Sequence, residues 1–149
     1  MANNPVRLER IVEKLPFGFD LLRAEAQAEG YRHLERLAEE WSAGTMRFDR
    51  EGEVLLAARF DADLAGIGGL TIDPALPGAL RMRRFYVGKS FRRNGIGRAL
   101  AEKLLAHARA SGARVTVNAA AGSGRFWVSL GFVSDLRNGH THVVVESRD

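Results

Sequence analysis

A dense cluster of basic side chains occupies one stretch of the sequence and points to the binding of a polyanion. Residues 80–101, LRMRRFYVGKSFRRNGIGRALA, contain seven arginines and lysines and no acidic residue. The end of this stretch is typical of a strand that passes through a glycine-containing turn into a helix. Unpaired N–H groups at the start of a helix bind phosphate oxygens, so this pattern predicts a polyphosphate ligand.

The turn supplies donors from both the backbone and the side chains. We expect a strand at 80–87, a turn at 88–95 and a helix that opens at Gly95. Gly95 and Gly97 carry no side chain that would keep an anion away from the backbone N–H groups. The nearest basic side chains can neutralise the charge of the ligand: Arg92, Arg93 and Arg98.

The excess of positive charge is local. The chain carries 22 basic and 18 acidic residues, a net charge of +4, while the segment 80–101 alone carries +7 and leaves −3 for the rest. Nucleic-acid-binding proteins usually spread their basic residues over a face, so we expect a small polyanionic ligand and no nucleic acid. A solvated surface position remains the alternative for any single one of these arginines.

Length and composition predict one soluble domain over residues 1–149. With 149 residues and 46% hydrophobic content, the chain is long enough to bury a core without cross-links. Cysteine is absent, which excludes disulfides, thiolate metal sites and a cysteine nucleophile, and allows a reducing compartment. No apolar run approaches the ~18 residues that span a bilayer. We therefore expect a cytoplasmic protein without a membrane partner.

Hydrophobic periodicity predicts a mixed α/β sheet. The expected strands are 6–12, a short strand at 45–49, a hairpin of 53–60 and 64–72, then 80–87, 113–118 and 141–147. The expected helices are 19–30, 31–44, 95 to about 111, and a short helix within 122–132. Strands and helices alternate without a repeat or a low-complexity linker.

Three local patterns imitate other sites. Gly88, Lys89 and Ser90 look like the end of a nucleoside triphosphate loop, but the glycine that this loop needs five residues earlier is Arg83. The third glycine of a dinucleotide fingerprint would fall at Leu100. His140 and His142 share one side of a strand without a third ligand, so no metal site is expected.

The remaining pattern resembles the GNAT superfamily of acetyl-CoA-dependent N-acetyltransferases. It combines R-x-x-G-x-G at 92–97, the preceding strand that ends in FYV, and FWVSLGF at 126–132. The resemblance extends in element order from about residue 6 to 147. It implies a single-domain, mixed and mostly antiparallel sheet flanked by helices, in which a central pair of strands splays apart.

The resemblance also implies where acetyl-CoA binds. Backbone groups of Phe85 and Val87 would bond the pantetheine amides, which replace a strand in the gap. Asn118 would reach the ligand from the end of the facing strand, unless it is buried as a cap of that strand, and Ser123 would cap the following helix. The backbone N–H groups that would hold the pyrophosphate belong to Arg92, Arg93, Asn94, Gly95, Ile96, Gly97 and Arg98.

The implied chemistry is direct attack of a neutral amine on the thioester in a ternary complex. It needs a base that deprotonates an ammonium group of pKa ~10 and an acid that protonates the leaving thiolate. It also needs a hydrogen-bond donor to the oxyanion, for which the resemblance implies the N–H of Val87. In many relatives a tyrosine is the general acid at the position of Trp127, and a glutamate is often the general base at the position of Arg81. Water, Tyr86 or a histidine such as His142 must therefore take over these proton transfers.

The acceptor is the least determined part of the function. Arg81, Arg83 and Arg84 alternate along their strand, so at least one faces the open side of the sheet unless a bulge intervenes. An amine with a carboxylate or phosphate would suit such an arginine, whereas an ion pair with a glutamate of the N-terminal helices is the structural alternative. A catalytically weak acyl-CoA-binding sensor of the same fold is the second functional hypothesis, and the sequence permits a homodimer.

Overall fold

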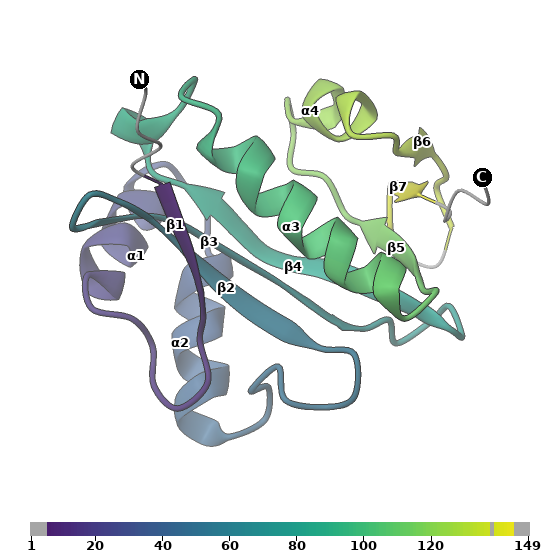
Figure 1. Ribbon diagram of the computed structural model, residues 1–149, viewed down its shortest axis with the longest axis horizontal. Helices are drawn as coiled ribbons and strands as arrows, with labels where there is room; N and C mark the ends of the chain where they lie inside the picture. The colour runs from purple at the N-terminus through teal and green to yellow at the C-terminus, as the bar shows by residue number, and fades with distance from the viewer. Residues whose placement is uncertain (1–5, 138, 145–149) are drawn as a thin grey trace.

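The computed structural model describes residues 6–137 and 139–144 (Figure 1). The strands are β1 (Val6–Arg10), β2 (Val54–Phe60), β3 (Asp63–Ile72), β4 (Ala79–Val87), β5 (Arg114–Val117), β6 (Val133–Ser134) and β7 (His142–Val144). The helices are α1 (Phe19–Ala28), α2 (His33–Ala43), α3 (Ile96–Ala110) and α4 (Gly124–Ser129), with a 3₁₀ turn, η1 (Lys89–Phe91), before α3. The alternation of these elements confirms the expected mixed α/β class.

The described strands form one sheet in the order β1-β2-β3-β4-β5-β7-β6. All neighbouring pairs are antiparallel except β4 and β5, which run parallel. The connection between these two parallel strands is α3, as a parallel pair requires a crossover. The mostly antiparallel sheet that the sequence predicted is confirmed.

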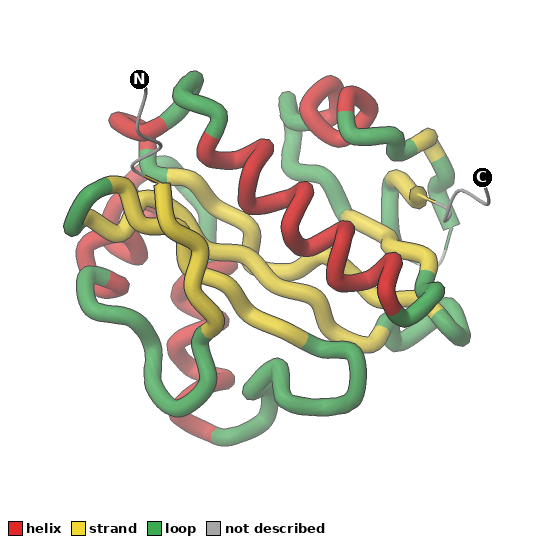
Figure 2. Tube along the Cα trace, viewed as in Figure 1, coloured by secondary structure: helices red, strands yellow, loops and turns green. Residues whose placement is uncertain are grey.

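Helices cover both faces of the sheet, with α3 in front of it and α1 and α2 behind it in the view of Figures 1 and 2. Each helix is amphipathic: α2 buries Leu34, Leu37 and Trp41, while α3 buries Leu100 and Leu104 at helical spacing. Burial of one such side chain stabilises the fold by about 1.5–3 kcal/mol. The two helical layers therefore hold the sheet rigidly between them.

A β-bulge interrupts β4 at Arg84. Gly69 pairs with Arg83 and Ile67 pairs with Tyr86, so two residues of β4 lie opposite the single residue Gly68. Arg84 adopts the left-handed conformation with a φ of 56°. Gly68 is required here, because a Cβ atom at this position would lie 2.7 Å from the ring of Phe85. The bulge changes which side chains of β4 share a face.

The parallel strands β4 and β5 separate halfway along β4. Their pairing runs from Ala79–Arg114 to Met82–Val117 and ends there, while β4 continues to Val87. The carbonyl of Val117 instead accepts the N–H of Thr141 at 2.9 Å, which draws the end of β5 toward β7. This divergence is the splayed central pair that the resemblance implied.

Two sequence expectations need correction. Residues 45–49 do not form a strand, because Phe48 adopts a φ of 56° and buries its ring beneath Gly69. The last strand is shorter at its start than predicted and begins at His142; residues 145–147 lie outside the described residues. Among the described helices, none is long and apolar enough to cross a membrane.

Candidate active site

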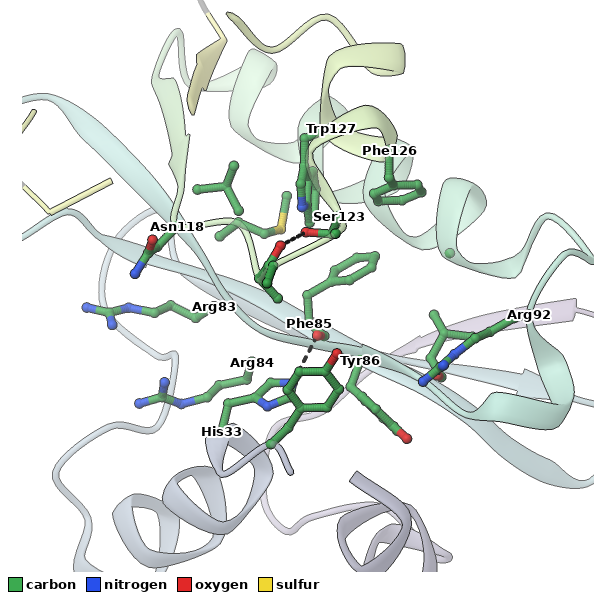
Figure 3. Close-up of a pocket in the computed structure, with 18 of the residues that line it drawn as sticks. His33, Arg83, Arg84, Phe85, Tyr86, Arg92, Asn118, Ser123, Phe126 and Trp127 are labelled. Atoms are coloured by element: carbon green, nitrogen blue, oxygen red, sulfur yellow. Dashed lines mark hydrogen bonds between the residues drawn. The ribbon is translucent and has the colours of Figure 1, made fainter. Parts of the chain in front are cut away.

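A cleft of about 1130 Å³ opens where β4 and β5 diverge (Figure 3). Its walls come from the α1–α2 connection and the start of α2, from β4, from the turn before α3 and the start of that helix, from the segment after β5, and from α4. The predicted site residues that line it are Phe85, Tyr86, Val87, Arg92, Arg93, Gly95, Gly97, Arg98, Asn118, Ser123 and Trp127. Three predicted residues are not part of its lining: Asn94, Ile96 and His142.

The edge of β4 presents its backbone to this cleft. Gly88 donates its N–H to the carbonyl of Ala65 at 2.8 Å, so the alternation of an antiparallel ladder turns the polar groups of Val87 and Phe85 away from β3. The Phe85 carbonyl accepts Nε2 of His33 at 3.1 Å, and the Val87 carbonyl accepts Nε of Arg92 at 2.9 Å. Each carbonyl has a second lone pair for a further donor.

The start of α3 presents backbone donors to the same cleft. Gly95 is the N-terminal cap, with a φ of 77°, and its carbonyl accepts the N–H of Ala99 at 3.0 Å. The N–H groups of Ile96, Gly97 and Arg98 precede this bond and have no partner within the helix. The side chain of Ile96 is fully buried, so this residue can serve a ligand only through its backbone. The helix dipole adds to the attraction for an anion.

The guanidinium of Arg92 is already bound to another side chain. Its two terminal nitrogens donate to the carboxylate of Glu29 at 2.6 and 3.1 Å, and it lies over the ring of Tyr86. The sequence predicted that this side chain neutralises a polyanion, but its charge is compensated by Glu29. Arg93 in the turn and Arg98 in the first turn of α3 are exposed as well. Arg98 donates to the carbonyl of Ser129 at 3.2 Å and has a long ion pair of 3.6 Å with Glu102.

Tyr86 lies on the opposite face of β4 from Phe85. Its ring is buried in the cluster beneath α1 and α2, and its hydroxyl donates to the carboxylate of Glu29. Burial and the hydrogen bond to Glu29 raise the pKa of the Tyr86 hydroxyl, while hydrogen bonds from Arg92 and Tyr86 lower the pKa of Glu29. The hydroxyl is therefore protonated at neutral pH and oriented toward α1.

Trp127 belongs to an aromatic cluster behind the cleft. Its ring centroid lies 4.8 Å from that of Phe126, 5.0 Å from Phe85 and 5.4 Å from Phe132, and the residue is 4% exposed. Each contact is a T-shaped packing typical of aromatic cores. The side chain supports the wall of the cleft, and its indole N–H is a hydrogen-bond donor only.

The segment after β5 forms the wall opposite β4. Asn118 is exposed in the cleft, which excludes its burial as a strand cap. Ser123 occupies the N-terminal cap position of α4, but its hydroxyl donates to the carbonyl of Ala120 at 2.8 Å and not to the helix. The expected side-chain cap is wrong, because the local turn already offers that carbonyl.

His33 is a cleft residue that the sequence did not single out. It is the first residue of α2, it is half-buried, and its Nε2 faces the carbonyl of Phe85. Burial lowers the pKa of His33, the hydrogen bond to Phe85 raises it, and the charges of Arg84 and Arg36 lower it further, with a net decrease. A neutral imidazole whose Nε2 donates to Phe85 keeps Nδ1 as a proton acceptor.

Three arginines of β4 share the face that carries α2, because of the bulge. Arg81 bonds Asp73 at 3.3 Å and Thr116 at 3.3 Å, and Arg84 bonds Glu40 of α2 at 2.7 Å. The ion pair of Arg84 with a glutamate of the N-terminal helices is the structural alternative that the sequence left open. Arg83 donates Nε to the hydroxyl of Thr71 at 3.1 Å.

The histidines of β7 and its preceding loop lie elsewhere. His142 is half-buried in β7, and its Nδ1 lies 2.7 Å from the hydroxyl of Thr141. It is not among the residues that line the cleft. Within residues 6–137 and 139–144, no group of three or more histidine, aspartate or glutamate side chains could hold a metal ion.

Comparison with known proteins agrees with this architecture. The family model of the acetyltransferase (GNAT) domain matches residues 17–143. A solved structure of a protein assigned as an acetyltransferase from Exiguobacterium sp. 255-15 is 25% identical, with a TM-score of 0.85 over 94% of this chain and 93% of that one. A search of curated proteins finds no significant match.

Two further solved structures share the fold and contain the cofactor. The PaiA N-acetyltransferase from Thermoplasma acidophilum, in complex with coenzyme A, is 16% identical, with a TM-score of 0.64 over 96% of this chain and 99% of that one. A GNAT family acetyltransferase from Elizabethkingia anophelis, with acetyl-CoA bound, is 13% identical, with a TM-score of 0.61 and 96% coverage of both chains. Together with the family match over residues 17–143, the splayed sheet identifies this chain as a member of the GNAT acetyltransferase family.

Proposed function

We propose that this protein transfers an acetyl group from acetyl-CoA to a primary amine of a small molecule or peptide by direct attack in a ternary complex. The observation that carries this proposal is the unpaired edge of β4 beside the free helix start of α3, in one cleft. The cofactor complexes of two proteins with the same fold support the choice of acetyl-CoA. The absence of cysteine argues against an acyl-enzyme and is compatible with a cytoplasmic location.

The cleft offers groups that could bind the pantetheine arm and the pyrophosphate of acetyl-CoA. The amides of a pantetheine arm match the backbone groups of Phe85 and Val87, which face away from β3. The pyrophosphate would rest on the N–H groups at the start of α3, with Arg93 and Arg98 as charge partners. On the opposite wall, Asn118 and Ser123 supply polar groups. We propose these contacts as the cofactor site.

We propose three groups of the chain for the chemistry. The bound thioester provides an electrophilic carbonyl, and the N–H of Val87 is the proposed donor for the charge that develops on its oxygen. His33 is the proposed acceptor of the proton from the amine, since its neutral ring lines the cleft and His142 does not. Tyr86 stays a candidate donor to the leaving sulfur, although its hydroxyl is bound to Glu29.

An acyl-CoA-binding sensor is the second candidate function. It is favoured by the replacement of the usual glutamate and tyrosine by Arg81, which is bonded to Asp73, and Trp127, which is packed in an aromatic cluster. A sensor would bind the cofactor as the enzyme does. The two functions differ in whether any amine is acetylated.

Acetyl-CoA and CoA should both stabilise the fold against heat, whereas ATP should have a smaller effect. Binding to the native state alone contributes ~2.7 kcal/mol at a ligand concentration ~100 times the dissociation constant. Differential scanning fluorimetry with the three ligands tests this. A larger shift with ATP than with CoA would refute the proposed pantetheine contacts, because ATP shares only the polyphosphate and the adenosine.

His33→Gln should lower kcat/KM by about 10² without a comparable loss of cofactor affinity. General-base catalysis contributes ~10² to 10⁴, and a glutamine amide can still donate to the carbonyl of Phe85 but cannot accept a proton. Because the pKa of His33 is lowered, its neutral form persists below the ordinary value of ~6.5. Wild-type activity should therefore fall on the acid side only below this pH.

The pH profile of the variant is the deciding measurement. If His33 is the base, the acid limb that its protonation causes should disappear in His33→Gln. A variant with wild-type kcat/KM and an unchanged acid limb would assign acceptance of the amine proton to water, because the Tyr86 hydroxyl is itself protonated at neutral pH. His107→Gln is a matched control, because His107 lies on α3 and is not part of the lining of the cleft.

A further inference from the structure

We propose that the end of the cleft formed by β4 and α2 binds a carboxylate or phosphate group of the acceptor, and that Arg83 holds this anion. The acceptor would then be a small amine that also carries a negative charge. This inference rests on the proposed acetyl transfer, because an acceptor exists only if that reaction takes place. The binding site itself can be tested without any turnover.

The charge of the lining is the first observation. The described residues that line the cleft include eight arginines and one histidine, and none of them is an aspartate or glutamate. Three of the arginines belong to the turn before α3 and to the first turn of α3, where the pyrophosphate is expected: Arg92, Arg93 and Arg98. The other five lie on the α1–α2 connection, α2 and β4: Arg32, Arg36, Arg81, Arg83 and Arg84. The lining at this end is therefore basic beyond the arginines that the pyrophosphate is expected to meet.

Figure 3 separates the two ends of the cleft. The guanidinium groups of Arg83 and Arg84 lie on the same side of this view as Asn118, while Arg92 lies on the other side, with Phe85 between them. A pyrophosphate bound at the turn before α3 lies at the Arg92 end of the cleft and cannot also contact Arg83 and Arg84. The positive charge at the Arg83 and Arg84 end is therefore left for the acceptor.

The ion pairs single out one arginine of β4. Arg81 is paired with Asp73 at 3.3 Å, and Arg84 with Glu40 at 2.7 Å. Among the described residues, no carboxylate lies within 4.0 Å of the Arg83 guanidinium, although a small neighbouring cavity that Arg83 also borders contains Glu53. The contact of Arg83 is the neutral hydroxyl of Thr71 at 3.1 Å. Its charge is not compensated by an ion pair.

The position of Arg83 is costly without an anion. Its side chain is half-buried beside two other arginines. Burial lowers the pKa of Arg83, and the charges of Arg84 and Arg81 lower it further; the more distant carboxylates of Glu40 and Asp73 raise it by less, so the net change is a decrease. An anion placed against the guanidinium would offset both effects, since a charge-assisted hydrogen bond is about twice as strong as a neutral one. Arg32 and Arg36 are exposed, so water compensates their charges.

The geometry of Arg83 suits a planar or tetrahedral anion. Because Nε is bonded to Thr71, the plane of the guanidinium is constrained. The two terminal nitrogens remain as a fork, which matches the paired oxygens of a carboxylate or phosphate. The same positive field would repel polyamines and lysine-rich peptides, and it would lower the pKa of a nearby acceptor ammonium. The site thus selects an anionic amine and promotes its neutral form.

Acceptor preference is the direct test. Phosphoethanolamine is compared with ethanolamine, β-alanine with its neutral amide, and spermidine represents a polycation. We expect kcat/KM to be at least tenfold higher for one anionic amine than for its neutral analogue, and the two pairs distinguish phosphate from carboxylate. Equal or higher rates with the neutral analogues or spermidine would overturn the inference while leaving acetyl transfer intact.

Variants of Arg83 test whether the preference for anionic amines depends on this residue. Arg83→Gln should remove the preference by lowering kcat/KM tenfold or more for the anionic amine only, and Arg83→Lys should retain part of it, because the charge remains without the fork. Arg109→Gln removes the same charge from the exposed last turn of α3 and should change neither. An anionic preference that survives in folded Arg83→Gln would contradict the assignment.

A binding measurement separates this inference from the proposed function. Phosphoethanolamine and β-alanine are titrated calorimetrically into CoA-saturated wild type and Arg83→Gln. At least tenfold weaker binding to the variant supports the site even if no amine is acetylated, in which case acetyl transfer fails alone. Absence of binding to the wild type, or equal binding to both proteins, would refute the anion site.

Discussion

Substitution of Gly97 by glutamate should abolish the binding of coenzyme A and leave the fold intact. Gly97 is the second residue of α3 and lines the cleft at the proposed pyrophosphate site. A Cβ atom at Gly97 would lie 3.4 Å from Val87 and 3.7 Å from the ring of Phe126, which are ordinary contacts. The added carboxylate would compete for the free N–H groups and repel the pyrophosphate.

Calorimetric titration of CoA into three proteins tests this prediction. We expect at least a hundredfold weaker binding for Gly97→Glu, and less than tenfold for the matched variant Gly97→Ala, which adds the Cβ atom without the charge. Both variants should unfold cooperatively near the wild-type temperature. If folded Gly97→Glu bound CoA as wild type does, the pyrophosphate would have to bind elsewhere.

Reversal of the charge at position 81 should destabilise the protein by about 3–5 kcal/mol. Relatives often carry a catalytic glutamate at this position, so Arg81→Glu is the substitution that would restore a base. In this chain, however, Arg81 is buried and paired with Asp73, whose carboxylate also accepts the hydroxyl of Thr116 at 2.6 Å. Loss of one partner from a buried ion pair costs about 3–5 kcal/mol, and a second carboxylate adds repulsion.

Urea denaturation over a range of pH measures this effect. Burial raises the pKa of Asp73, but the hydrogen bonds from Thr116, Ala75 and Leu76 and the charge of Arg81 outweigh it, so the pKa is lowered. A carboxylate with a lowered pKa stabilises the fold above its unfolded pKa of ~3.9 and loses this contribution as the pH falls. The deficit of Arg81→Glu should therefore be complete above pH ~5 and shrink in acid.

Two controls interpret the result at position 81. Arg81→Met removes the charge but keeps much of the volume, and should lie between wild type and Arg81→Glu in stability. Arg7→Glu reverses an exposed arginine whose ion pair with Glu9 is long, at 3.8 Å, and should cost far less. A stable Arg81→Glu protein with faster acetyl transfer would show that position 81 still serves as the base position.

The sequence by itself determined the helices and strands that show a local pattern of hydrophobic periodicity or a helix-start motif. Glycines at 95 and 97 after a basic turn predicted the helix start of α3, and period-two and helical patterns predicted the strands and helices on both sides of it. The same patterns gave the family resemblance, and with it the splayed pair of strands. Residues 45–49 were predicted wrongly because alternation of short polar and apolar residues does not reveal a left-handed residue such as Phe48.

Only the tertiary structure decided which partners the site residues have. Arg92 meets Glu29, and His33 meets the carbonyl of Phe85, across separations of 63 and 52 residues. The bulge at Arg84 moves this residue to the face of Arg81 and Arg83, from which strict alternation would have separated it. Periodicity records how each residue relates to its own helix or strand, whereas these contacts depend on how the elements pack. The charge of the turn could therefore be predicted from the sequence, but not that Glu29 neutralises Arg92 while no described carboxylate forms an ion pair with Arg83.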